Sequence, residues 1–213
     1  MNVNIGYVVA VFVVAIFSII LHELAHGIVA YCLGDKTAKY SGRLTLNPLK
    51  HIDPFMSIIL PAVLALIGAP ILGGAKPVPI NTRNLKWREF GFALVAIAGP
   101  LTNLILAFIF FMIGHFTEAF YVDGLGGIIC QAGMFTNMGF ALFNIIPIPP
   151  LDGSRVLYAL APESVQNFLR SMEQYGFIVI YMLMLLCGSM LSRYFIAGEN
   201  GLLDFFYFLV GVR

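Results

Sequence analysis

Long apolar stretches separated by short polar ones run through this chain, and the pattern predicts helices that cross a membrane. The first stretch runs from about Ile5 to Leu33. As a helix it would be roughly 43 Å long, which exceeds the ~30 Å hydrocarbon core of a bilayer. Further stretches of spanning length are Phe90–Phe116, Leu125–Ile146 and Phe168–Leu191. About four full transmembrane helices are therefore expected.

Two apolar segments are too short or too interrupted to be read as ordinary spans. Phe55–Leu72 is broken by Pro61 and by Gly68-Ala69-Pro70, so it is either a short span or a re-entrant hairpin. Gly201–Val212 is about half a span long, and we expect it to lie in the interface or to dip into the bilayer. The fold class that follows is an all-α polytopic membrane protein with short apolar segments besides its full spans.

The composition agrees with this class. Of the 213 residues, 60% are hydrophobic and 11% are charged, whereas soluble domains carry about 25% charged residues. The net charge of +1 gives no footprint for a nucleic acid. Because the loops are short, we expect one membrane-embedded domain over residues 1–213, with a core at 5–157 and C-terminal helices at 163–213.

Candidate chemistry lies inside the first apolar helix. His22, Glu23 and His26 are spaced as H-E-x-x-H. Residues i and i+4 share one face of a helix, so both imidazoles can reach one metal ion. Glu23 lies about 100° further round the helix, close enough to hold a water bound to that metal. This is the pattern of a zinc metallopeptidase, with two histidine ligands and a glutamate as general base.

A chance match on a solvated helix face is the plain alternative, but the surroundings argue against it. Each ionisable group in a membrane helix costs roughly 2.5–3.5 kcal/mol on insertion scales. Three of them within five residues need a compensating partner, and a bound cation is the simplest one. The sequence therefore predicts a zinc site within the membrane.

Two further motifs are less specific from the residues alone. Ala98–Asn103 reads A-G-P-L-T-N, which fits a proline-kinked helix with Asn103 as a packing amide. Asn144–Gly153 reads N-I-I-P-I-P-P-L-D-G, and its prolines end the preceding helix. Spacing leaves open whether Asp152 caps the helix that starts near Arg155 or serves the metal.

The distribution of charge predicts a topology. The loops Lys36–Lys50 and Lys76–Arg88 are basic, whereas the loop at Glu118 has no Lys or Arg. Positive residues stay in the cytoplasm, so both basic loops are cytoplasmic if Phe55–Leu72 is re-entrant. The same arrangement brings Asp152 to the depth of the motif histidines, so two independent arguments favour the re-entrant interpretation.

Taken together, three motifs resemble those of the site-2 protease family of zinc intramembrane metalloproteases. They are H-E-L-A-H at His22–His26, A-G-P-L-T-N at Ala98–Asn103 and N-I-I-P-I-P-P-L-D-G at Asn144–Gly153. Their order and spacing match that family over most of residues 15–157. The short loops are similar to those of its compact prokaryotic branch, which lacks a PDZ domain.

The resemblance implies that Asp152 is the third ligand of one zinc ion per chain, beside His22 and His26. It suggests that Asn144, and with it Asn103, contacts the substrate backbone or the oxyanion. The expected activity is endoproteolysis of transmembrane segments of other membrane proteins, in a prokaryotic cell membrane and toward its cytoplasmic side.

Such a substrate must unwind, and short β-strands near residues 39–48 would offer it an edge to pair with. The substrate protein and the lipid bilayer are the expected partners, and the pattern is compatible with an oligomer.

Two rival functions use the same residues. A metal or ion transporter could use the motif groups and Asp152 as a transit site, but it would gain nothing from Glu23 placed directly after the first histidine. A catalytically inactive homologue could bind helices without cutting them, although its motifs would not need to be intact.

Overall fold

Four long apolar helices form the frame of the molecule. The computed structural model describes residues 5–66, 73–122 and 124–212. Within them, four helices are long and apolar enough to cross a membrane: α1 (Ile5–Cys32), α4 (Arg88–Phe116), α5 (Leu125–Asn144) and α8 (Gly176–Leu209). The predicted class, an all-α polytopic membrane protein with about four full spans, is confirmed.

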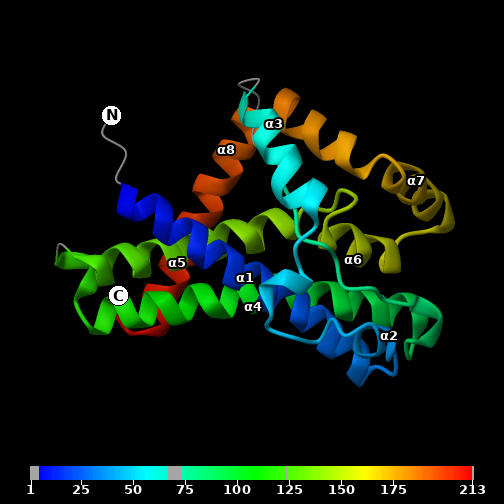
Figure 1. The fold of residues 1–213 in the computed structure, drawn as a ribbon, viewed down its shortest axis with the longest axis horizontal. Coiled ribbons are helices and arrows are strands. Elements are labelled where there is room, and N and C mark those ends of the chain that lie inside the picture. Colours follow the sequence, from blue (N-terminus) through cyan, green and yellow to red (C-terminus); the bar gives the residue numbers. More distant parts are fainter. Residues whose placement is uncertain (1–4, 67–72, 123, 213) are drawn as a thin grey trace.

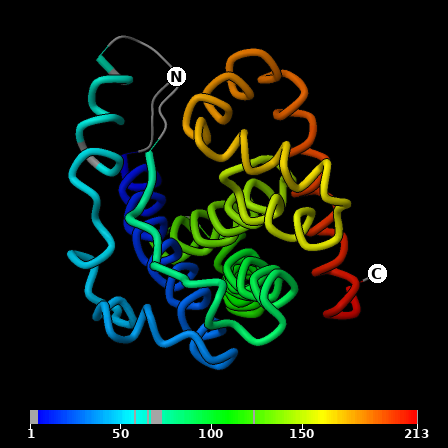
Figure 2. Tube along the Cα trace, turned by 90° about the vertical axis from the view of Figure 1, so that its right-hand side faces the viewer, coloured from blue at the N-terminus to red at the C-terminus, as the bar shows by residue number. Residues whose placement is uncertain are grey.

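Helices α1, α4 and α5 pack side by side and carry the site (Figure 1). Shorter elements complete the described chain: α2 (Thr37–Tyr40), η1 (Pro48–Lys50), η2 (Pro54–Ile59), α3 (Leu60–Leu66), η3 (Thr82–Asn84), η4 (Ala119–Tyr121), α6 (Asp152–Leu160) and α7 (Glu163–Glu173). Viewed from the end of the bundle, α3 and the chain around it lie on one side, and α6, α7 and the start of α8 lie on the other (Figure 2).

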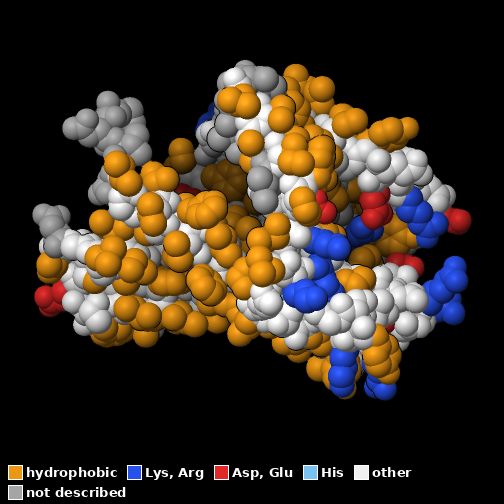
Figure 3. Space-filling view, in the orientation of Figure 1, with side chains coloured by type: hydrophobic (Ala, Val, Ile, Leu, Met, Phe, Trp, Pro, Cys, Tyr) orange, Lys and Arg blue, Asp and Glu red, His pale blue; other side chains and the backbone are white. Residues whose placement is uncertain are grey.

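Aromatic and sulfur-containing side chains make the core between α4, α5 and α8. Phe111, Met138 and Phe206 are almost completely buried there, with Ala107 and Met134 beside them. Most other large apolar side chains of the long helices point outward, as expected for helices whose surroundings are lipid. Figure 3 shows these apolar side chains covering the α1, α4 and α5 part, while Lys and Arg gather at the other end.

The prediction of short β-strands near residues 39–48 was wrong. Residues Thr37–Tyr40 form the helical turn α2, and the loop that follows has no strand among its residues. The reason is the buried guanidinium of Arg43, which donates to the carbonyls of Lys50, Lys76 and Pro77. These contacts fold the loop around one side chain, so its backbone does not extend into a ladder.

The C-terminal boundaries also differ from the prediction. Phe168 belongs to the amphipathic helix α7, and the expected separate segments ending at Leu191 and starting at Gly201 are parts of one helix, α8, with a kink at Cys187. Tertiary contacts hold the part of α8 that follows the kink against the other helices. The Tyr194 hydroxyl donates to the carbonyl of Leu142 on α5 (3.0 Å), and Phe206 is buried in the core.

The segment after α1 leaves the bundle and comes back at nearly the same place. The Lys76 N–H donates to the carbonyl of His51 (2.8 Å), and the Gly74 N–H donates to that of Met56 (3.1 Å). Residues 54–66 between these contacts are helical, and the predicted turn at Gly68-Ala69-Pro70 lies outside the described residues. Because its two ends are bonded to each other, this arrangement favours a segment that enters and leaves on one side.

The two basic loops are tied to the end of α1 through a buried acid. Asp35 accepts hydrogen bonds from the Thr37 N–H and hydroxyl, the Asn81 N–H and the Asn84 amide. Burial alone would raise the pKa of Asp35, but these donors outweigh it and hold that pKa below its usual value. The carboxylate therefore stays charged and joins residues that precede the segment 54–66 to residues that follow it in the sequence.

Cysteine labelling from one side of the membrane tests this topology. Single cysteines at Lys39 and Arg83, in a background without the three native cysteines, should both react with an impermeant reagent added to the cytoplasmic side. A cysteine at Glu118 is the control and should react only from the opposite side. Labelling of Lys39→Cys and Arg83→Cys from different sides would show that the segment between them crosses the bilayer.

Candidate metal centre

Three ligand atoms from two distant segments meet at one point. His22 and His26 lie one turn apart on α1, and Asp152 is the first residue of α6. The two Nε2 atoms are 3.0 Å apart, and the Asp152 Oδ2 atom lies 3.2 Å from that of His22 and 3.4 Å from that of His26. Ligand atoms of a tetrahedral zinc with bonds of 2.0–2.1 Å are about 3.3–3.4 Å apart. The triangle is therefore the right size for one zinc ion.

The donor set also fits a cation in its electrostatics. The Oδ2 atom of Asp152 is buried and has no hydrogen-bond donor, which is costly for a carboxylate unless a cation compensates it. Asp152 could therefore serve as the anionic ligand that a zinc ion requires.

The far side of each imidazole is bonded to α4. The Nδ1 atom of His22 lies 2.6 Å from the side-chain oxygen of Asn103, and that of His26 lies 2.7 Å from the Val95 carbonyl. Both acceptors take a proton from Nδ1, which leaves each Nε2 lone pair free for the metal. Such outer partners orient ligand histidines in metal sites generally.

A close approach of α4 to α1 makes these contacts possible. A Cβ atom at Gly99 would lie 2.5 Å from the Nε2 atoms of both His22 and His26, so only glycine fits there. A second glycine serves Asp152, because a Cβ at Gly153 would collide with the Ile145 carbonyl. Gly99 of the A-G-P-L-T-N motif is therefore required by its contact with the two histidines, and Gly153 of the L-D-G motif by the backbone at Ile145, beside Asp152.

We expect Gly99→Ala to weaken zinc binding by about ten-fold or more while the helices still form. The added methyl group must push one imidazole aside, and overpacking of this kind costs about 1–3 kcal/mol. Gly139→Ala on α5 is the matched control, because nothing lies within 4 Å of its new Cβ. Zinc affinity measured by competition with a chelator should fall only for Gly99→Ala, and an equal fall for both would contradict this assignment.

Glu23 faces a different neighbour from the histidines. Its Oε2 atom accepts a hydrogen bond from the backbone N–H of Val78 (2.8 Å). Val78 lies between Pro77 and Pro79, so its N–H is the only backbone donor of that P-V-P triplet. Arg43 binds the carbonyl just before it, at Pro77, and so holds this segment in place. The segment around Val78 therefore fixes the position of Glu23.

Asn103 and Asn144 occupy different surroundings. Asn103 is fully buried, and it accepts from His22 while its NH2 group donates to Asn137 (2.8 Å). Asn144 is partly buried at the end of α5, and its amide donates to the Phe140 carbonyl one turn back (3.0 Å). The substrate or oxyanion role expected for both stays a prediction, and the contacts of Asn103 favour orientation of His22 instead.

Sequence reasoning missed Asn137. It is fully buried on α5, and its amide nitrogen donates to the Gly133 carbonyl (2.8 Å). A signal was present, because an amide within an apolar span is expensive and usually has a partner. Its partner is Asn103 on α4, which lies far away in the sequence and could not be read from local spacing.

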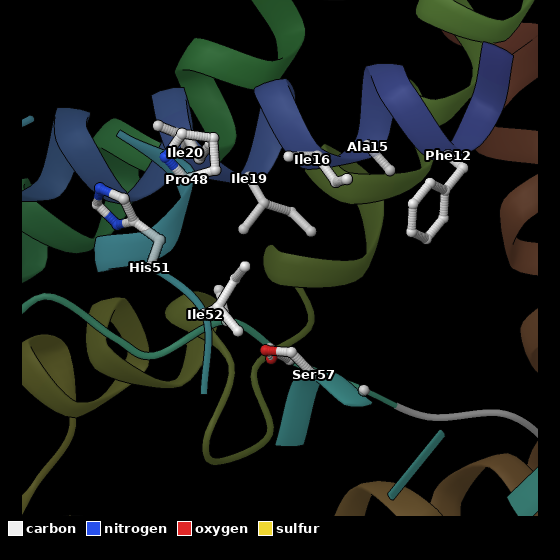
Figure 4. Close-up of a pocket in the computed structure, with 12 residues that line it drawn as sticks. Phe12, Ala15, Ile16, Ile19, Ile20, Pro48, His51, Ile52 and Ser57 are labelled. Atoms are coloured by element: carbon white, nitrogen blue, oxygen red, sulfur yellow. Dashed lines mark hydrogen bonds between the residues drawn. The ribbon is translucent and has the colours of Figure 1, made fainter. Parts of the chain in front are cut away.

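An apolar cavity of about 430 Å³ runs along the outer face of α1 (Figure 4). Phe12, Ile16 and Ile19 face the chain at residues 48–57 across it. His51 lines this cavity and is bonded through Nε2 to the Thr45 carbonyl (2.8 Å), so it is not part of the triad. A second cavity of about 240 Å³ is lined by Leu151, next to Asp152.

Comparison with known proteins finds relatives that are named as enzymes. The chain is 42% identical to the Bacillus subtilis protein named "Putative zinc metalloprotease YwhC" over 174 residues, 79% of this chain and 76% of the relative. It is 34% identical to "Putative zinc metalloprotease Rip2" of Mycolicibacterium smegmatis, over 88% of this chain and 71% of the relative. A similarly named protein of Methanocaldococcus jannaschii is 30% identical over 71% and 73%. No protein-family profile and no solved structure matches the chain.

Proposed function

This chain belongs to the zinc metalloprotease family of YwhC and Rip2, and we propose that it is an intramembrane endopeptidase of the site-2 type. The observation that carries the proposal is the position of the triad. His22 and His26 lie within α1, a 28-residue apolar helix long enough to span a bilayer. A peptidase built into such a helix meets substrates that are themselves in the membrane.

The proposed chemistry is hydrolysis of a peptide bond by an activated water. His22, His26 and Asp152 would hold one zinc ion, which when bound supplies a water with a pKa near ~7. Glu23 accepts the proton of the attacking water and later gives it to the amine that leaves. The Val78 N–H holds one carboxylate oxygen of Glu23, which leaves the other oxygen free for the water.

The substrate in this proposal is a transmembrane helix of another protein, which must unwind before its peptide bonds can be reached. The apolar lining of the cavity beside α1, with Phe12, Ile16 and Ile19, supports an approach from the lipid along that helix. Its floor includes the irregular backbone of Gly73–Ala75. Non-helical backbone can pair with an extended peptide, so this strip is a candidate for contact with an unwound substrate.

The side of the membrane is also a proposal. Lys and Arg side chains gather at the end of the bundle where the loops after α1 lie (Figure 3), and basic loops stay in the cytoplasm. The motif histidines lie in the half of α1 nearer that end. We therefore expect water to reach the site from the cytoplasmic side of a prokaryotic cell membrane.

The test is cleavage of a purified membrane-spanning substrate in lipid vesicles, with and without a chelator. Cleavage within the transmembrane segment that stops on chelation and returns with zinc is the expected result. Cleavage confined to a soluble loop of the substrate would leave a zinc metalloprotease but overturn the intramembrane proposal. Metal flux across the vesicle without any cleavage would favour a transporter.

A further inference from the structure

A chain of buried hydrogen bonds leads from the metal centre to a residue that lies outside it. The Nδ1 atom of His22 is bonded to the Asn103 oxygen (2.6 Å), the Asn103 nitrogen to the Asn137 oxygen (2.8 Å), and the Asn137 nitrogen to the Gly133 carbonyl (2.8 Å). Asn103 and Asn137 are both completely buried, so no water competes for these groups.

The Gly133 carbonyl, at the far end of this series of hydrogen bonds, determines which group donates in each of them. The Gly133 group is a backbone carbonyl, which can only accept a hydrogen bond. Asn137 must therefore turn its NH2 group toward Gly133 and its oxygen toward Asn103. Asn103 must in turn present its NH2 group to Asn137 and its oxygen to His22. An oxygen at that place requires a proton on Nδ1, and the proton is then absent from Nε2.

We propose that Asn137 is a positioning residue that sets the tautomer of His22 and so keeps its Nε2 atom ready for the metal. This inference rests on the zinc site of the proposed function. Without the Asn137 oxygen, no hydrogen bond on that side favours one orientation of the Asn103 amide over the flipped one. If it turns over, its NH2 group faces Nδ1 and the proton moves to Nε2, which faces Asp152 at 3.2 Å. Zinc must then displace that proton.

His26 provides the contrast within the same site. Its Nδ1 atom is bonded directly to the Val95 carbonyl (2.7 Å), an acceptor that cannot turn over. The tautomer of His26 is therefore fixed by backbone, whereas that of His22 depends on two amides that can rotate. The tautomer of His22 is thus the less firmly fixed of the two, and the residue that fixes it, Asn137, lies on α5.

The experiment measures zinc affinity by chelator competition for Asn137→Leu and Asn137→Ser. Leucine suits an apolar helix, and serine can keep a bond to the Gly133 carbonyl but is too short to reach Asn103. Both should bind zinc roughly 10–100-fold more weakly, the usual effect of losing an outer partner of a ligand histidine. Wild-type affinity in both folded variants would overturn the proposal.

Repeating the measurement in an Asn103→Asp background shows whether Asn137 acts by orienting Asn103 or only by filling space. A carboxylate offers oxygen on both sides, so Asn103→Asp accepts from His22 whichever way it turns. In that background, Asn137→Leu should cause no further loss of zinc affinity, and an undiminished loss would overturn the proposal. Met138→Ala is the matched control, because Met138 is the next residue, is equally buried and belongs to the apolar core. It should lower thermal stability without changing zinc affinity.

These outcomes are distinct from a failure of the proposed function. If the wild-type protein binds no zinc, the metal centre itself is wrong. If the wild type binds zinc and cleaves its substrate while the Asn137 variants match its affinity, only the role of Asn137 is wrong. Because the readout is zinc binding, no cleavage has to be observed for the test to decide.

Discussion

Glu23→Gln is expected to keep the zinc ion and the fold but to lose proteolysis by roughly 10²–10⁴-fold, the usual contribution of a general base. The amide can still hold a water, but it cannot accept its proton. It can also keep the structural contact of Glu23, because its oxygen can accept from the Val78 N–H as the carboxylate does now (2.8 Å). Cleavage rate, zinc content and thermal stability measured on one preparation would separate these effects.

The matched control changes another acid in the same way. Glu89→Gln lies in the exposed first turn of α4 and should leave the cleavage rate unchanged. Wild-type cleavage by Glu23→Gln would show that Glu23 is not the base. A large loss of stability instead would mean that the charge of Glu23, through its contact with the segment at Val78, is needed for folding.

His22→Ala should nearly abolish zinc binding, and Asp152→Ala should weaken it. Binding of structural zinc is worth about 10–16 kcal/mol, so removing one of three protein ligands removes roughly a third of it. That corresponds to an affinity lower by about 10²–10⁴-fold. The wild type should carry one zinc per chain in elemental analysis, and His22→Ala should carry almost none after dialysis.

His51→Ala is the control for this loss. His51 is equally buried but bonded to the Thr45 carbonyl, away from the triad, so its removal should leave the zinc content at one per chain. Loss of zinc in His51→Ala alone would move the metal centre to the loop after α1. A wild type without stoichiometric zinc would remove the metal centre altogether.

Local sequence patterns were enough to predict the four membrane-spanning helices and the two histidines of the metal site. The four long helices follow from apolar length, because a bilayer accepts only segments whose side chains are apolar and whose backbone is internally bonded. His22 and His26 could be paired from spacing, because the α-helix puts residues i and i+4 on one face. The zinc interpretation then followed from the cost of such groups in an apolar helix.

Local patterns gave wrong predictions where contacts between distant segments determine the structure. The loop at 39–48 has residues that suit a strand, but the Arg43 guanidinium gathers three carbonyls and folds it otherwise. Near the C-terminal end of α8, Phe206 is buried against residues of α4 and α5. Neither contact follows from a regular repeat of apolar and polar residues, so the local sequence pattern could not predict it.

The sequence by itself determined the membrane class, and it predicted the two histidine ligands and the general base, because those predictions rest on spacing within one helix. Spacing left Asp152 open between a helix cap and a metal ligand, and a family resemblance favoured the ligand. Only the tertiary structure brought its Oδ2 atom to 3.2 Å from the His22 Nε2 atom, and Gly99, Val78 and Asn137 to their places around the site. These residues act across helix interfaces, where the physical requirement is a close fit between surfaces rather than a repeat along the chain.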